Sequence, residues 1–189
     1  RRHDQAIRSR LMGIPTLIST CTASNTAICA FTSGIDSTYD EYMFVFTDIG
    51  PATDSAEFLF DTSTDGGSNY ASTKTTSTFS ASHAENDSAA SLGYETSYDL
   101  AQATDGQQIA NSLGSGADES AAGILHLFSP SSTTYVKHFY ARMSYYHKSN
   151  FNFDLFTSGY INQTADIDAI KFYMDSGNFD GVIQMYGIA

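Results

Sequence analysis

Two runs of alternating apolar and polar residues near the C-terminal end constrain the possible folds most strongly. In the first run, Ile170, Phe172 and Met174 share one face of an extended chain. Lys171 and Tyr173 lie on the opposite face, and this period of two is the pattern of a half-buried β-strand. A Ser-Gly-Asn cluster, typical of turns, separates the two runs. The sequence therefore predicts a closing β-hairpin and a fold made of sheets.

The composition also favours strands over helices. The 189 residues include 25 Ser and 20 Thr, with 12 Tyr, 13 Phe and no Trp. Hydroxyl side chains compete with the helical backbone, whereas aromatic side chains suit a pleated sheet. A chain of this length buries a sufficient core for one domain and needs no disulfide to fold. We expect an all-β protein, a jelly-roll-like antiparallel β-sandwich of roughly ten strands.

Turn signals divide most of the chain into strand candidates. The clearest hairpin joins residues 124–128 to residues 134–146 across a Ser-Pro turn. Residues 70–80 are expected to return antiparallel to the preceding strand, and a short helix is an alternative around residues 84–91. The other strand candidates are residues 41–49, 57–61, 91–98, 107–113, 151–159 and 160–164.

A second hairpin is predicted near the N-terminal end, between residues 16–22 and 27–32. This pairing would place Cys21 and Cys29 opposite each other. The two cysteines fit either a disulfide or small, partly buried strand residues. Without a nearby His or acidic pair they fall short of a zinc site. We expect free thiols, and we expect no bound metal or cofactor.

The charge argues against two classes of partner. The formal net charge is −12, with only nine Lys and Arg. Proteins that bind nucleic acid present a basic surface that neutralises phosphates, so no nucleic-acid partner is expected. No apolar run reaches the roughly 18 residues that a membrane-spanning helix needs. We therefore expect no membrane insertion.

Basic residues concentrate at the N-terminal end: Arg1, Arg2, Arg8 and Arg10 are four of the nine. We divide the chain into a basic N-terminal arm, residues 1–15, and a single β-sandwich domain, residues 16–189. The arm is a candidate for docking onto an acidic neighbouring subunit. The alternative is a loosely ordered terminal segment.

Residues that often carry catalysis form no catalytic pattern in this sequence. Among the five histidines, only His126 and His138 fall on strands that are predicted to pair, and no Ser, Asp or Cys partner can be placed beside them. A histidine satisfied within a sheet is therefore favoured over a hydrolase triad. The many acidic residues offer carboxylate pairs by chance. We predict that the chain is not an enzyme.

An aromatic group provides the candidate binding residues. Tyr145, Tyr146 and His147 lie at the end of a predicted strand. Aromatic side chains stack on sugars and are enriched at subunit contacts, although core packing is an alternative for the same rings. We take these three residues as a candidate binding site.

Residues 63–70 (STDGGSNY) predict a structural turn. They partly resemble the Asp-box hairpin of sialidases and other β proteins, with Asn69 and Tyr70 in place of the usual Thr and Trp. In that motif the Asp braces the turn, so we assign Asp65 to hydrogen bonding within the turn. Gly66 and Gly67 supply the positive φ that a tight turn demands.

Six motifs along the chain carry a further resemblance. They are residues 17–20 (LIST), 31–39 (FTSGIDSTY), 51–54 (PATD), 63–70 (STDGGSNY), 125–134 (LHLFSPSSTT) and 172–179 (FYMDSGNF). With them the chain resembles a group of small structural proteins encoded by marine tailed bacteriophages. The match spans nearly all of residues 16–188, and residues 1–11 fall outside it. The resemblance brings no catalytic set.

The resemblance implies a non-enzymatic virion structural protein on the particle exterior. The preferred reading is an appendage, a tail fibre or spike, or a surface module that contacts the host or neighbouring subunits. The alternatives are a capsid decoration (cement) protein and a secreted carbohydrate-binding module. The expected partners are copies of itself and other virion proteins, with a host surface glycan as a further candidate.

Overall fold

The computed structural model describes residues 13–189, and that range contains only strands, turns and loops. Thirteen strands, all paired antiparallel, form one continuous network. The prediction of an all-β sandwich is therefore confirmed, with thirteen strands where roughly ten were expected. Within the described range there is no helix long and apolar enough to cross a membrane.

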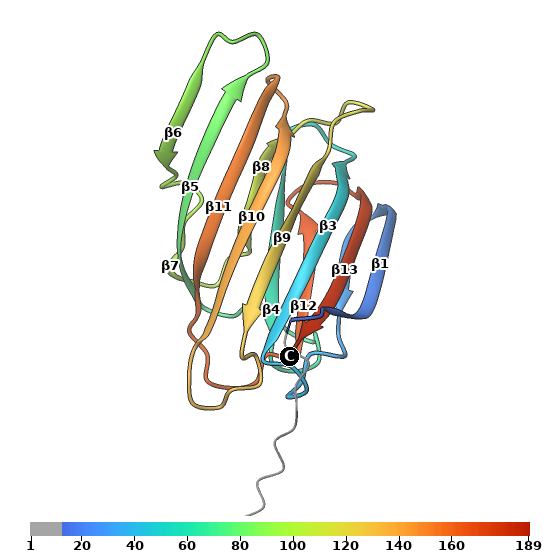
Figure 1. Ribbon diagram of the computed structural model, residues 1–189, viewed down its shortest axis with the longest axis vertical. Helices are drawn as coiled ribbons and strands as arrows, with labels where there is room; N and C mark the ends of the chain where they lie inside the picture. Colours follow the sequence, from blue (N-terminus) through green and yellow to red (C-terminus); the bar gives the residue numbers. More distant parts are fainter. Residues whose placement is uncertain (1–12) are drawn as a thin grey trace, which may run out of the picture.

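The larger layer, which we call the front sheet, crosses the face seen in Figure 1. Its strands follow the order β1-β13-β3-β9-β10-β11-β5, and the short strands β6 and β7 pair with the free side of β5. Their bounds are β1 (Thr16–Thr26), β3 (Glu41–Pro51), β5 (Lys74–Ala84), β6 (Ala90–Tyr94), β7 (Ala101–Ala103), β9 (Ala121–Phe128), β10 (Lys137–His147), β11 (Phe151–Ile161) and β13 (Phe179–Ile188).

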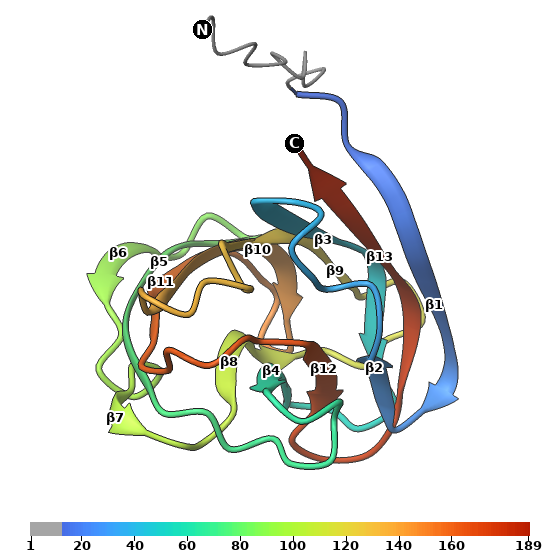
Figure 2. The ribbon, with the colours of Figure 1, turned by 90° about the horizontal axis from the view of Figure 1, so that it is seen from below.

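The smaller layer, the back sheet, has the order β8-β4-β12-β2. Figure 2 shows it beneath the curved front sheet. The two sheets connect through a single residue pair, His147 of β10 with Leu113 of β8. The bounds of these strands are β2 (Ile28–Phe31), β4 (Ala56–Ser63), β8 (Gln107–Leu113) and β12 (Ala169–Met174).

Eight of the strands have the arrangement of a jelly roll. Strands β1, β13, β3 and β9 face β2, β12, β4 and β8. Among strands of this set that directly follow each other in the chain, the chain changes sheet from β1 to β2, β2 to β3, β3 to β4, β8 to β9, and β12 to β13. The remaining strands enlarge one layer only. Strands β10 and β11 follow β9, and β5 to β7 follow β4, and all of them extend the front sheet.

The predicted C-terminal hairpin is wrong, although its strands and their faces are right. Ile170, Phe172 and Met174 are buried as expected. However, β12 pairs with β4 and β2 in the back sheet, whereas β13 pairs with β1 and β3 in the front sheet. Residues 175–178 turn a corner between sheets, because four residues reach across the ~10 Å that separates packed sheets.

The predicted N-terminal hairpin is wrong for the same reason. Strand β1 pairs with β13 and strand β2 pairs with β12, so the chain again changes sheet. Asn25 adopts φ +50° just before this corner. The expectation of free thiols is also wrong, because Cys21 and Cys29 form a disulfide with their Cα atoms 6.0 Å apart. The bridge joins the two sheets at their shared edge.

Three further expectations need correction. Strand β5 does not return beside β4 but pairs with β11. Residues 84–91, an alternative helix, contain a turn and the start of β6. Residues 151–164 form one strand to Ile161, because Gly159 tolerates a close approach to its neighbour; a Cβ there would lie 2.4 Å from the carbonyl oxygen of Thr75. The hairpin of β9 and β10 is confirmed.

The core is aromatic at one end and polar at the other. Under β3 and β13, Phe44, Phe46, Phe58 and Phe172 pack edge to face, tilted or stacked, with ring centroids 5.0–6.1 Å apart. Between β5, β11 and β8 the inward side chains include many hydroxyls and amides, packed beside aliphatic residues such as Leu155 and Ile109. There the Thr76 hydroxyl donates to the side-chain oxygen of Gln107 at 2.7 Å. Buried polar groups of this kind persist because they are hydrogen-bonded.

Candidate functional site

The outer surface of the front sheet is the candidate functional site. We call the outward-facing side chains of β5, β11, β10, β9 and β3 the front face. Register places one residue from each strand in a continuous row across the sheet. From β6 to β3 this row consists of Tyr94, Phe79, Phe156, Arg142, Ile124 and Val45.

At the centre of the row, aromatic rings stack between neighbouring strands. The rings of Phe79 and Phe156 are nearly parallel, with an interplanar angle of 5° and centroids 4.8 Å apart. The guanidinium of Arg142 lies 4.7 Å from the Phe156 centroid, on the side of Phe156 that faces β10. Phe156 therefore has both ring faces covered. Phe156 and Phe79, which is 44% exposed, form an apolar ridge.

A second aromatic cluster lies on the front face two residues further along β9 and β10 from the row. The His126 ring stacks on Tyr140 with centroids 4.7 Å apart, and the Phe128 ring lies 6.2 Å from His126 and 5.7 Å from Tyr140. The imidazole Nδ1 of His126 contacts the Glu41 carboxylate. Each of these residues is held by a neighbour, and Tyr140 remains 44% exposed.

A shallow trough lies beside the ridge. It has a volume of about 490 Å³ and is lined in part by Arg142, Asp154, Asn152, Ile124 and Ala122. A neighbouring hollow of about 360 Å³ is also lined by Ala122 and Asn152, together with Tyr145 and Tyr146 of β10. Small residues on β9 and β10 create this depression next to the larger rings of β11 and β5.

The carboxylates around the ridge and the trough are paired. Glu41 contacts His126, and Asp154 accepts two hydrogen bonds from the Arg142 guanidinium at 2.7 and 3.0 Å. Asp48, near the far end of β3, is exposed. On a chain that has 21 acidic residues against nine basic ones, the centre of the front face is therefore nearly neutral.

The three predicted binding residues point in different directions. Tyr146 faces outward, and its hydroxyl donates to the Glu85 carboxylate at 3.0 Å. Tyr145 faces the core, is only 3% exposed, and has its pKa raised by burial. His147 stacks on Phe153 with centroids 4.9 Å apart, and burial lowers its pKa. None of the three lines the trough itself, and Tyr145 and Tyr146 line the neighbouring hollow.

The predicted turn has the expected chemistry. The Asp65 carboxylate accepts hydrogen bonds from the Ser63 hydroxyl at 2.7 Å and from the Asn69 backbone at 2.8 Å. These contacts lower its pKa to about 2. Gly66 and Gly67 have φ of +69° and +86°. All of the donors lie within the turn, so Asp65 braces the loop.

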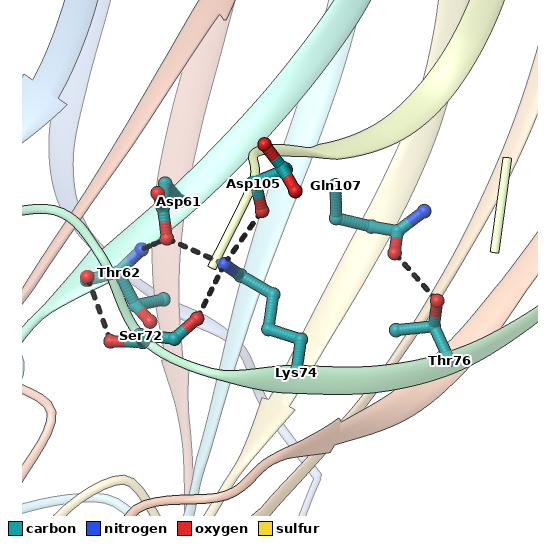
Figure 3. A network of polar contacts seen from close by, with 7 residues as sticks. All are labelled: Asp61, Thr62, Ser72, Lys74, Thr76, Asp105 and Gln107. Atoms are coloured by element: carbon teal, nitrogen blue, oxygen red, sulfur yellow. Dashed lines mark hydrogen bonds and ion pairs between the residues drawn. The ribbon is translucent and has the colours of Figure 1, made fainter. Parts of the chain in front are cut away.

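One buried polar network involves a lysine (Figure 3). The Nζ of Lys74 lies 2.7 Å from an Asp61 carboxylate oxygen and donates to the backbone carbonyls of Ser72 and Asp105 at 2.8 and 3.1 Å. Burial raises the pKa of Asp61 and lowers that of Lys74, while the attraction between the charges opposes both shifts. Three oxygen acceptors match the three donors of an ammonium group. This network ties the loop after β4 to the loop before β8.

The two histidines on paired strands, His126 and His138, do not face each other. Register places His126 opposite Tyr140, so His138 lies two residues away along β10 and packs near Tyr160. In residues 13–189 no group of three or more His, Cys, Asp or Glu side chains could hold a metal ion. The candidate docking residues Arg1, Arg2, Arg8 and Arg10 lie outside the described residues.

Sequence reasoning missed the ridge. Phe79 and Phe156 belonged to predicted strands, yet only the register between β5 and β11 aligns them. An available signal was the position of Phe79 among Thr and Ser residues, where an aromatic side chain occupies the face opposite Thr76 and Thr78.

Comparison with known proteins adds no assignment: no protein-family model matches the chain, and no curated protein matches its sequence.

Proposed function

We propose that this protein is a non-enzymatic structural protein of a bacteriophage virion. In this role it is an exterior appendage, a tail fibre or spike, or a surface module that contacts the host or neighbouring subunits. The observation that carries the proposal is the front face, where an apolar ridge and trough cross several strands without a free carboxylate. Exposed patches of this kind mark interaction sites.

Two further features support a structural role on the particle exterior. The Cys21–Cys29 disulfide suits an oxidising environment outside the cell, where such bridges persist. Two charged side chains of types that are common in catalytic sites stabilise the fold instead. Lys74 holds two loops together, and Asp65 holds its own turn. The motif resemblance to virion proteins of tailed bacteriophages is the reason for proposing the virion as the assembly.

Immunolabelling of purified particles tests the proposal. Antibodies against the recombinant chain should label intact particles of the phage that encodes it. Label on the tail supports a fibre or spike, and a regular pattern on the head supports the alternative of capsid decoration. Particles that contain no copy of the chain would refute the virion role.

The trough supports a second candidate, a carbohydrate-binding module. Arg142, Asp154 and Asn152 place charged and amide groups around a hollow of about 490 Å³, and ligand sites combine apolar walls with a few polar groups. A glycan array separates this candidate from a hydrolase. Saturable binding without cleavage of the bound sugar is expected for a module, whereas turnover would assign an enzyme.

A further inference from the structure

The ridge and the trough lie side by side on the front face. Phe79 and Phe156 rise above β5 and β11, and the hollow lined by Arg142 and Ile124 lies over β10 and β9. When a projection and a depression are neighbours on one face, a twofold axis between them places each projection in the depression of the other copy. A surface that fits itself in this way is what an isologous interface requires.

We infer that two copies of this chain associate face to face through the front face, around a twofold axis. The inference deepens the proposed structural role and rests on it for its biological meaning. The partner is a second copy of the chain, and the contact surface is the front face. Self-association and the virion role can fail separately, because the first is measured on the isolated protein and the second on particles.

Charge favours a second copy as the occupant. Each chain has a formal net charge of −12, so two copies repel each other across most surfaces. The centre of the front face avoids this repulsion, because Asp154 is paired with Arg142 and Glu41 contacts His126. An acidic protein associates with itself most readily where such charges are absent or neutralised. The part of the front face around the ridge and the trough meets that condition.

The area of the front face is close to that of a standard interface. From β5 to β3 the face spans five strands, about 20 Å at a spacing of ~4.8 Å. Strands β10 and β11 have eleven residues each, about 35 Å in length. The resulting patch of roughly 700 Å² approaches the ~800 Å² per partner of a standard interface. The front sheet curves outward (Figure 2), so the contact is centred on β11 and β10.

Ring orientation favours a protein surface over a sugar as the occupant. A pyranose ring stacks on the open face of an aromatic ring. Both faces of Phe156 are covered, by Phe79 and by the Arg142 guanidinium. Ring edges and aliphatic groups such as Ile124 remain for contact, and these pack against apolar side chains of a partner.

Sedimentation velocity of the full chain tests the inference at concentrations from about 1 to 100 µM, the weak end of the affinity range of interfaces of this size. The wild-type protein is expected to reach twice its 20.5 kDa mass. Phe79→Glu and Tyr140→Glu each place a charge on the front face at a position that is 44% exposed. Each variant should weaken the dimer at least about thirtyfold.

Tyr135→Glu is the matched control. Tyr135 is 73% exposed in the loop between β9 and β10, outside the front face. Its substitution by Glu should therefore leave the dimer intact. Circular dichroism of each variant shows that the β fold is retained. A wild-type protein that stays monomeric at every concentration would overturn the inference, as would a dimer unaffected by both front-face variants. A monomer whose glycan binding is lost in Phe79→Glu would assign the face to a sugar instead.

Discussion

The Nζ of Lys74 and a carboxylate oxygen of Asp61 lie 2.7 Å apart where both side chains are almost fully buried, 0% and 4% exposed. Removing one partner leaves the other charge buried without compensation. We therefore expect Lys74→Met to lower the free energy of unfolding by about 3–5 kcal/mol. Urea denaturation at pH 7 measures the change. A loss below about 1 kcal/mol would show that the pair does not brace the fold.

The exposed ion pair on the front face provides the contrast. Arg142 and Asp154 are hydrogen-bonded, yet the Arg142 side chain is 59% exposed. Solvent screens such a pair, so Arg142→Met should change the free energy of unfolding by less than about 1 kcal/mol. The same urea experiment gives both values. Equal losses in the two variants would contradict the assignment of the buried pair as the structural one.

The disulfide should stabilise the edge where the two sheets meet. Cys21 and Cys29 are eight residues apart, and closing a loop of this size in the unfolded chain contributes about 2–3 kcal/mol. Replacing both cysteines with Ala should lower the melting temperature. A reducing agent should lower the melting temperature of the wild type and leave the double variant unchanged. Free thiols in the unreduced wild-type protein would contradict the bridge.

The turn at Asp65 gives a direct titration test. Hydrogen bonds from Ser63 and Asn69 lower its pKa from 3.8 to about 2. The folded state holds this carboxylate ionised, so its stabilising effect is present above pH 3.8 and is lost as the pH falls toward about 2. Carboxyl chemical shifts followed by NMR measure the pKa. Asn69→Ala keeps the backbone donor but removes the side-chain amide that donates to the second Asp65 oxygen at 2.6 Å, and should raise the pKa; an unchanged value would show that this contact is not a cause.

His147 predicts a second pH dependence, at higher pH. Burial lowers the pKa of His147 below the ordinary value of 6.5 for an imidazole, so the unfolded chain binds a proton more readily than the folded one. The stabilising effect is therefore complete above pH 6.5 and is lost as the pH falls through the lower pKa of the folded state. Unfolding free energies of the wild type and of His147→Phe, measured between pH 5 and 8, isolate the effect. The variant should show the smaller decline toward acidic pH.

The sequence was sufficient to identify strands and their buried faces, because a period of two records which side of a strand meets the core. Ile170, Phe172 and Met174 are the clearest case. It was not sufficient to identify strand partners. A short turn looks the same whether it closes a hairpin or turns a corner between sheets, so the connection from β12 to β13 was read as a hairpin.

The candidate site was less accessible to sequence reasoning than the fold. Tyr146 was found because it lies in an aromatic run, but Tyr145 beside it points into the core. The ridge joins Phe79 to Phe156, which are far apart in sequence and meet only through the pairing of β5 with β11. Long-range register of this kind is not encoded in any local pattern.

Imaging of the assembled particle tests the central claim most directly. A cryo-electron microscopy map of the virion at side-chain resolution would locate the thirteen-stranded sandwich and show what covers Phe79 and Phe156. We predict copies on the particle exterior, with the front face against a neighbouring copy. A complete virion map without this subunit, or with its front face open to solvent in every copy, would contradict the account.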